Sequence, residues 1–173
     1  MNRLNQKGVG LIEVLVALVI LALGVLGFAA LQLRALDAAQ EATEQTVAMN
    51  TARDLAERMR VNRTALSDYK TAINTKKSID TCIGTNDITS PKALAIPKCN
   101  ETDFAQQDAG EILEKATANG QTIVVDDCVK SEMSCIYVSW GKTDISADDV
   151  SECVDTTTGT YLVDSKCLVL EAF

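Results

Sequence analysis

The chain has 173 residues, a formal net charge of −8 and no histidine. The acidic balance gives no sign of a basic surface for nucleic acid. The lack of histidine removes the usual general base of enzymes and the Ser-His and Cys-His nucleophile pairs. We therefore expect neither a nucleic-acid-binding protein nor an enzyme, and we expect no cofactor.

All six cysteines lie in the second half of the chain or close to its middle: Cys82, Cys99, Cys128, Cys135, Cys153 and Cys167. An even count beyond an apolar N-terminal segment favours an oxidising compartment and disulfides. Zinc is the alternative, but the chain has no Cys-x-x-Cys and no histidine, which argues against a structural zinc site. Six cysteines allow many connectivities, so each pairing below is a hypothesis.

The N-terminus begins with a short basic leader that contains Arg3 and Lys7 and ends at Gly8. An apolar run then extends from Val14 to Leu31, long enough to cross a bilayer as a helix at about 1.5 Å per residue. A single carboxylate, Glu13, stands at the start of this run. Because an ionised side chain in a membrane segment is costly, we interpret Glu13 as a functional residue.

This arrangement, a basic leader that ends in glycine with glutamate at the fifth position after it, resembles the class III signal of type IV prepilins and pseudopilins. The resemblance implies that a prepilin peptidase recognises Lys7, Gly8 and Val9, cuts after Gly8 and methylates the amine of Val9. It also implies that Glu13 neutralises the N-terminal amine of a neighbouring subunit as helices stack in a filament.

Further stretches are similar to the PilV-like minor pilins, namely Leu15–Leu18, Leu23–Gly27, Leu31-Gln32 and Asp54–Asn62. The narrowest of these signals is Leu-Ala-Glu-Arg-Met-Arg-Val-Asn, at the end of the last stretch. The resemblance implies a subunit that works with other minor pilins, with major pilins and with the inner-membrane assembly machinery. Such subunits prime pilus assembly and thereby affect adhesion and twitching motility.

The helical pattern continues beyond the apolar run, because small and apolar residues recur at three- and four-residue spacing. This stripe consists of Leu36, Ala39, Thr43, Val47, Thr51, Leu55 and Met59. We predict one helix from about Val9 to about Asn62. Its membrane half is residues 9–33, and its amphipathic half, residues 34–62, packs against a globular domain of residues 63–173.

The segment from Arg63 to Ile73 is expected to extend or follow the long helix, and a loop extends from there to Pro97. Cys82 and Cys99 bracket this loop. Their pairing would contribute about 3 kcal/mol in the chain-entropy model.

A second helix is predicted from Thr102 to Ala118, with Thr102 or Asp103 as its cap and Asn119-Gly120 as its stop. Its expected apolar contacts are Phe104, Ala105, Ile112, Leu113 and Ala116.

Two β-prone runs, 122–125 and 135–140, flank the polar link 130–133 and predict an antiparallel hairpin. A symmetric four-residue loop would place Ile123 opposite Trp140 and Cys128 opposite Cys135. The core face would then hold Ile123, Val125, Ile136, Val138 and Trp140. The two cysteines would lie on the other face, close enough for a disulfide.

An acidic loop follows between Gly141 and Ser165, with Asp144, Asp148, Asp149, Glu152, Asp155 and Asp164. A solvated loop is the favoured interpretation and a calcium site the alternative, although the spacing matches no EF-hand. Cys153 and Cys167 bracket part of this loop, in a layout that resembles the disulfide-bounded C-terminal loop of type IV pilins. Residues 166–173 predict a final strand.

The sequence therefore predicts an α+β, type IV pilin-like fold: a leader of residues 1–8 and a long helix on a small disulfide-bonded antiparallel sheet. The expected function is that of a minor pilin, anchored in the inner membrane with a periplasmic domain and later part of an extracellular pilus. The alternatives are a type II secretion pseudopilin and a secreted binding module or enzyme with an ordinary signal peptide cut near Ala29 or Ala30.

Overall fold

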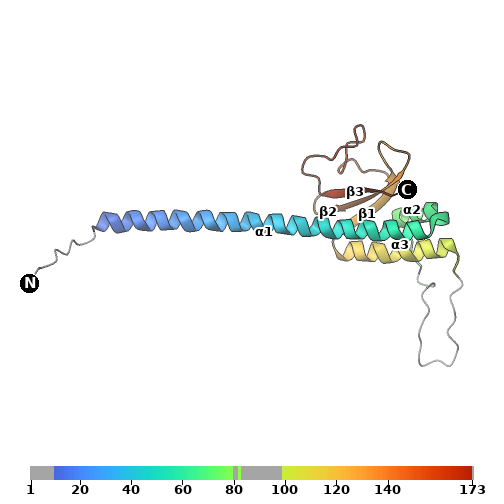
Figure 1. Cartoon of the computed structure of the whole chain (residues 1–173), viewed down its shortest axis with the longest axis horizontal. Coiled ribbons are helices and arrows are strands. Elements are labelled where there is room, and N and C mark those ends of the chain that lie inside the picture. Colours follow the sequence, from blue (N-terminus) through green and yellow to red (C-terminus); the bar gives the residue numbers. More distant parts are fainter. Residues whose placement is uncertain (1–9, 80–81, 83–98, 173) are drawn as a thin grey trace, which may run out of the picture. The chain divides into compact units, whose positions relative to one another are not determined.

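A computed structural model describes residues 10–79, 82 and 99–172. The expectations for Lys7, Gly8 and Val9 lie outside these residues, as does the body of the loop between Cys82 and Cys99. The chain divides into two compact units, residues 1–43 and residues 44–173, which are described separately. The elements are α1 (Leu11–Val61), η1 (Arg63–Ala65), α2 (Leu66–Thr75), α3 (Glu101–Ala118), β1 (Gln121–Asp127), β2 (Ser134–Trp140) and β3 (Cys167–Glu171). Figure 1 labels the three α-helices and the three strands.

The predicted long helix is present as α1, which has 51 residues. Burial of its apolar stripe begins further along the helix than the sequence pattern suggested. The side chain of Leu36 is 67% exposed, whereas the buried part of the stripe starts in the second unit, with Ala48, Thr51, Ala52, Leu55 and Met59. Periodicity alone could not separate these two parts, because it depends on residue type and not on what covers the helix.

The second unit adds a short 3₁₀ turn, η1, and two helices to the end of α1. The cap of α3 differs from the prediction, because Asn100 precedes the helix. Its side-chain oxygen accepts from the Asp103 N–H at 2.9 Å, and the Asp103 carboxylate accepts from the Asn100 N–H at 3.2 Å. This reciprocal pair satisfies two N–H groups that a helix start leaves without intrahelical partners. Phe104, expected to be a core contact, is 48% exposed.

The three strands form an antiparallel sheet in the order β1-β2-β3. The predicted register of the hairpin was wrong by two residues: Ile123 pairs with Val138, and Cys135 pairs with Asp126. The turn explains the difference, because the Cys128 N–H donates to the Met133 carbonyl at 2.8 Å. The link is therefore residues 129–132 and not 130–133. A shift of two residues keeps every side chain on its face, so the predicted core face was correct.

Both faces of the sheet are covered within this unit. One face packs against the helices and carries Ile123, Val125, Ile136, Val138 and Trp140. The opposite face packs under the loop between β2 and β3, through Ile145, Val150, Cys153 and Val154. The loop that was predicted to be acidic and solvated therefore contributes a second, smaller apolar core.

The three disulfides confirm the three predicted pairs, Cys82–Cys99, Cys128–Cys135 and Cys153–Cys167. Although Cys128 and Cys135 are not directly opposite, their Cα atoms lie 5.0 Å apart, within the range that a disulfide requires. Cys153–Cys167 fastens the covering loop to the first residue of β3.

Side chains bind the outer edges of the two edge strands. At β1, the Val125 N–H donates to the Asn74 side-chain oxygen at 3.0 Å, and the Asn74 amide donates to the Val125 carbonyl at 2.8 Å. At β3, the Val169 N–H donates to the hydroxyl oxygen of Tyr161 at 2.9 Å. These bonds occupy backbone groups that could otherwise pair with another chain.

Candidate functional site

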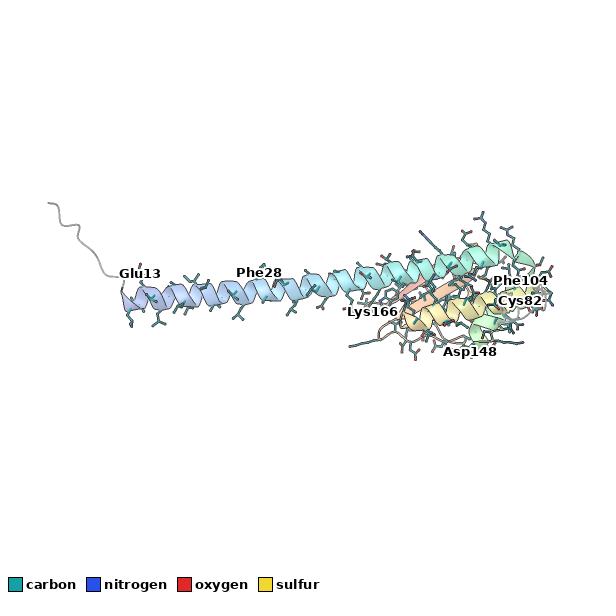
Figure 2. The ribbon with its side chains drawn as sticks, turned by 90° about the horizontal axis from the view of Figure 1, so that it is seen from below. Glu13, Phe28, Cys82, Phe104, Asp148 and Lys166 are labelled. Carbon is teal, nitrogen blue, oxygen red and sulfur yellow. A yellow bond between two sulfur atoms is a disulfide. The ribbon has the colours of Figure 1, made fainter. Side chains whose placement is uncertain are left out.

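The first candidate site is the apolar part of α1, seen with its side chains in Figure 2. This helix contains an 18-residue window with a mean hydropathy of 3.0, none of it buried. By length and composition it could cross a membrane, although a signal sequence near an N-terminus has the same properties. Residues 10–40 are all exposed in the single chain, so burying this surface requires lipid or other apolar helices.

Glu13 is the only charged residue between Gly10 and Leu33. It lies in the first turn of α1, where its own N–H donates to the Gly10 carbonyl at 3.0 Å. A carboxylate is favourable in this turn because the N–H groups there lack intrahelical acceptors. Among the described residues Glu13 has no ion-pair partner. The geometry therefore places one negatively charged hydrogen-bond acceptor at the start of an apolar helix.

The second candidate site is a cluster of charged groups that joins α1 to α3 in the globular unit. Arg58 donates to Asp54 at 3.1 Å, to Asp108 at 2.5 Å and to Glu111 at 2.8 Å. Lys115 donates to the other oxygen of Asp54 at 2.8 Å. Hydrogen bonds between charged groups are stronger than hydrogen bonds between neutral groups in proteins.

Tyr69 of α2 extends this cluster to a third helix. Its ring is fully buried, and its hydroxyl donates to Asp108 and lies 3.4 Å from the Arg58 carbonyl oxygen. Burial and the Asp108 carboxylate together raise the pKa of the Tyr69 hydroxyl. The cluster therefore joins α1, α2 and α3 at one place.

The cluster also changes the ionisation of its carboxyl groups. Burial opposes ionisation of Asp54, but hydrogen bonds from Lys115 and Arg58 outweigh it and lower the pKa of Asp54. Hydrogen bonds from Gln107 and Arg58 lower the pKa of Glu111. Both carboxylates are thus held in the charged form that Arg58 requires. The arrangement has the composition of a structural clamp.

The acidic loop does not assemble a calcium site in the described residues. Its carboxylates instead accept hydrogen bonds from the loop's own backbone: Asp149 from Ser151 at 2.8 Å, and Asp155 from Thr157 at 2.7 Å. These bonds lower the pKa of Asp149 and of Asp155. Such turns are a common use of aspartate in loops.

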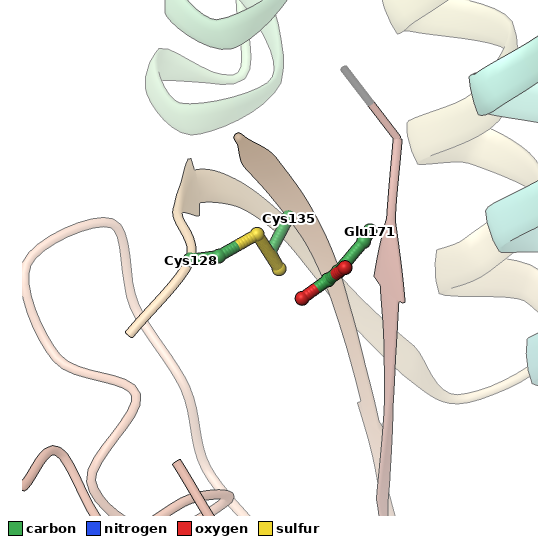
Figure 3. A group of neighbouring side chains, drawn as sticks. All are labelled: Cys128, Cys135 and Glu171. Carbon is green, nitrogen blue, oxygen red and sulfur yellow. A yellow bond between two sulfur atoms is a disulfide. The ribbon is translucent and has the colours of Figure 1, made fainter. Parts of the chain in front are cut away.

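One group of potential metal ligands does converge, namely Cys128, Cys135 and Glu171 (Figure 3). Glu171 pairs with Cys135 across β2 and β3, which brings its carboxylate to the sulfur atoms. The two sulfur atoms are bonded to each other, so neither can act as a thiolate ligand. We therefore assign this group to the disulfide framework.

Sequence reasoning had not identified Arg58, Asn74 or Asn100 as important side chains. The spacing of Asn100 and Asp103 is that of a capping box, and it could have indicated the helix start. Arg58 follows Asp54 by four residues, which signals a pair on one helix face. Its bonds to α3 join residues about fifty positions apart, and no local pattern indicates them.

Two family models match adjoining parts of the chain. Residues 3–29 match a prokaryotic N-terminal methylation motif, and residues 30–110 match a family described as Tt1218-like, type IV pilin Tt1218. No curated protein and no solved structure matches the chain. The two matches support a pilin or pseudopilin subunit that carries a prepilin signal.

Proposed function

We propose that this chain, a pilin or pseudopilin subunit by its two family matches, acts as a minor pilin of a type IV pilus. A prepilin peptidase removes residues 1–8, and the amine of Val9 becomes methylated. The helix holds the subunit in the inner membrane, with its domain in the periplasm, until the subunit enters the filament. There it works with other minor pilins and with major pilins in assembly, adhesion and twitching motility.

One observation carries this proposal: Glu13 is a single charge at the start of an apolar helix that is exposed along its length. An uncompensated carboxylate is costly in lipid, and the amine of a neighbouring subunit would relieve that cost. Head-to-tail repetition that does not close on itself generates a filament. A structural role also agrees with the Arg58 clamp and the disulfides, which serve stability.

The decisive experiment is the N-terminal sequence and intact mass of the mature protein, recovered from membranes and from sheared surface filaments. We expect a start at Val9 with one extra methyl group, and we expect wild-type protein in both fractions. A Glu13→Ala variant should be cut normally but remain in the membrane. A Glu57→Ala variant, which removes an exposed carboxylate of the same helix, should enter filaments as the wild type does.

Two outcomes would contradict the proposal. A mature start near Ala30 would mean that the apolar helix is a discarded signal peptide. Loss of protein secretion, with surface pili unchanged after deletion of the gene, would instead assign the subunit to a type II secretion system.

A further inference from the structure

The link between α3 and β1 contains Asn119-Gly120, the only Asn-Gly dipeptide in the sequence. Both residues are exposed. The side-chain amide carbon of an asparagine is an electrophile that the backbone nitrogen of the next residue can attack. Glycine in the next position makes this attack easiest, because it has no Cβ atom to crowd the nitrogen and its backbone adopts unusual conformations at little cost. Sequence and exposure therefore mark Asn119 as a site where deamidation can start.

The reaction needs only water as a co-reactant. The Gly120 nitrogen loses its proton to solvent hydroxide and forms a bond to the Asn119 Cγ atom, while the bond from Cγ to Nδ2 breaks. Nδ2 takes up a proton and leaves as ammonia, and a succinimide ring remains. Water then opens the ring at either of its carbonyl carbons. One product has aspartate at position 119, and the other has isoaspartate, in which the main chain passes through the side-chain carbons.

Hydrogen bonds at the end of α3 hold both reacting groups of this dipeptide. The Asn119 N–H donates to the Ala116 carbonyl at 3.1 Å. The Gly120 N–H donates to the Thr117 carbonyl at 3.0 Å, so the attacking nitrogen keeps its proton. The side chain of Asn119 is engaged as well, since its Nδ2 donates to the Lys115 carbonyl at 2.8 Å. The ordered helix end therefore opposes the first step of the reaction.

The backbone of the link also keeps the reacting atoms apart. The ψ angle of Asn119 is the torsion between its own nitrogen and the Gly120 nitrogen, and its value is 7°. The Gly120 nitrogen thus lies on the side of the Asn119 nitrogen and away from Cβ, whereas closure of the succinimide ring requires it to eclipse Cβ. The left-handed φ of Gly120, +66°, belongs to the same helix-ending conformation. Reaction therefore requires the last turn of α3 to open.

The link leads directly into a residue that connects β1 to α1. Gln121, the first residue of β1, is buried, and its side-chain oxygen accepts from the Thr51 hydroxyl of α1 at 3.1 Å. Isoaspartate would lengthen the main chain just before Gln121. Either product would add a negative charge where the last carbonyl groups of a helix already carry partial negative charge. Conversion would therefore weaken the junction of α3, β1 and α1.

We propose that Asn119 is a site of spontaneous deamidation whose rate is set by opening of the last turn of α3. In the folded chain the reaction is slow, because only the molecules with an open helix end react. The loss of ammonia makes each conversion irreversible, so the modified form accumulates with repeated opening of the α3–β1 junction. The modification requires neither an enzyme nor entry of the chain into a pilus.

The test follows the full chain, purified in a non-ionic detergent, in a mildly alkaline buffer with and without denaturant. Peptide mass spectrometry measures the mass gain of the amide-to-acid exchange and assigns it to a position. We expect conversion of Asn119 in both samples, at least about tenfold slower in the folded sample, as for a site that reacts only through local opening. Asn119→Gln should show no gain at this position, because its longer side chain would have to form a less favourable, larger ring.

Two outcomes would overturn the proposal. Absence of conversion in the denatured sample would remove the site itself. Equal rates in the folded and denatured samples would show that the helix end does not control the reaction. Because the test uses purified protein and reads a change at one residue, its result is independent of whether the subunit enters pili.

A variant that leaves the reacting groups intact tests the control by the fold. Gln121→Ala removes the bond to Thr51, so it should raise the rate in the folded sample by about threefold, the size of effect expected from one lost hydrogen bond. The rate in denaturant should not change. Gln106→Ala is the control, because Gln106 is partly exposed on α3 and has no bond in the described residues, and it should change neither rate.

Hydrogen exchange at the Gly120 amide provides an independent readout of the same opening, because the amide must first release the Thr117 carbonyl. In Gln121→Ala the exchange rate and the deamidation rate should rise together. Melting temperatures and intact disulfides must show that both variants are folded during the incubation. Faster exchange at Gly120 without faster deamidation, or a folded-state rate that stays at the wild-type value, would contradict control of the site by the α3–β1 junction.

Discussion

Arg58 shows how one side chain can hold three secondary-structure elements together. It binds Asp54 on its own helix and Asp108 and Glu111 on α3, while its carbonyl oxygen is near the Tyr69 hydroxyl of α2. Its position in the Leu-Ala-Glu-Arg-Met-Arg-Val-Asn stretch gives that stretch a structural meaning. Leu55 and Met59 are its buried members, and Arg58 provides the polar connection beside them.

Replacing Arg58 by methionine should destabilise the protein by about 2 kcal/mol. The change removes several charge-assisted hydrogen bonds and leaves three carboxylates facing one another, although partial exposure of the site reduces the penalty. The measurement is the free energy of unfolding of the full chain in detergent. Arg60→Met is the matched control, because Arg60 is exposed and has no partner in the described residues, and it should cost less than about 0.5 kcal/mol. Equal losses would refute the clamp.

At this scale the sequence indicated residues that stand out from their near neighbours and missed those whose partners are distant; the role of Glu13 stays a prediction. Glu13 could be singled out because it contrasts with the apolar residues around it. Arg58 could not, since most of its partners lie on α3. Asn74 lies in a stretch that the sequence predicts to be a turn. Its side-chain amide can form hydrogen bonds with the Val125 backbone only because α2 packs against the edge of β1.

At the scale of elements, the sheet depends on what covers its edges as much as on its hairpin. The Asn74 side chain reproduces, for one residue of β1, the pair of hydrogen bonds that another strand would provide. Tyr161 supplies one acceptor at β3. A three-stranded sheet with two such edges avoids pairing with other chains at these positions.

Replacing Asn74 by alanine should destabilise the protein by about 2 kcal/mol, because the N–H and C=O of the buried Val125 would lose their partners. Asn50→Ala is the control: Asn50 lies exposed on α1, and its replacement should change stability by less than about 0.5 kcal/mol. Hydrogen exchange at the Val125 amide provides a local readout, with faster exchange expected in Asn74→Ala only. Unchanged exchange at Val125 would show that Asn74 does not protect this edge.

The hairpin shows which features of an element can be predicted from sequence. Alternation of apolar residues determined the two faces correctly, because any register that differs by two residues preserves them. The turn determines the register, and residues 129–132 contain no Asn-Gly or similar dipeptide that would identify its position. The disulfide between Cys128 and Cys135 was still predictable, because diagonal neighbours on one face are also within reach of each other.

At the scale of the whole molecule, the predicted order of elements was correct, whereas the extent of burial was not. The pattern of α1 is continuous from Leu36 to Met59, but only residues from Ala48 onward are buried. The sequence likewise predicted a solvated acidic loop, whereas the structure shows that apolar residues of this loop are buried against one face of the sheet. In both cases tertiary packing decides which side of a pattern is covered.

Because the chain has no histidine, the stability of the domain depends on pH through other groups, among them Asp54, Glu111 and Tyr69. Asp54 and Glu111 have ordinary pKa values of 3.8 and 4.5, and both are lowered in the folded protein. A lowered pKa contributes stability that is present above the ordinary value and is lost as pH falls through the folded value. The pKa of Tyr69 is raised from 10.0, so its contribution is lost as pH rises above that value.

We therefore expect a melting temperature that is nearly constant from about pH 6 to pH 9 and falls below about pH 4.5. Because Asp54 and Glu111 are 32% and 44% exposed, solvent screening limits their combined contribution to about 1–2 kcal/mol, or several degrees. Thermal unfolding of the full chain in a non-ionic detergent measures this profile. The double variant Asp54→Asn and Glu111→Gln should melt lower at pH 7 and show a shallower fall on acidification. If the double variant keeps the full acid-dependent fall, carboxyl groups outside the Arg58 cluster determine the acid stability.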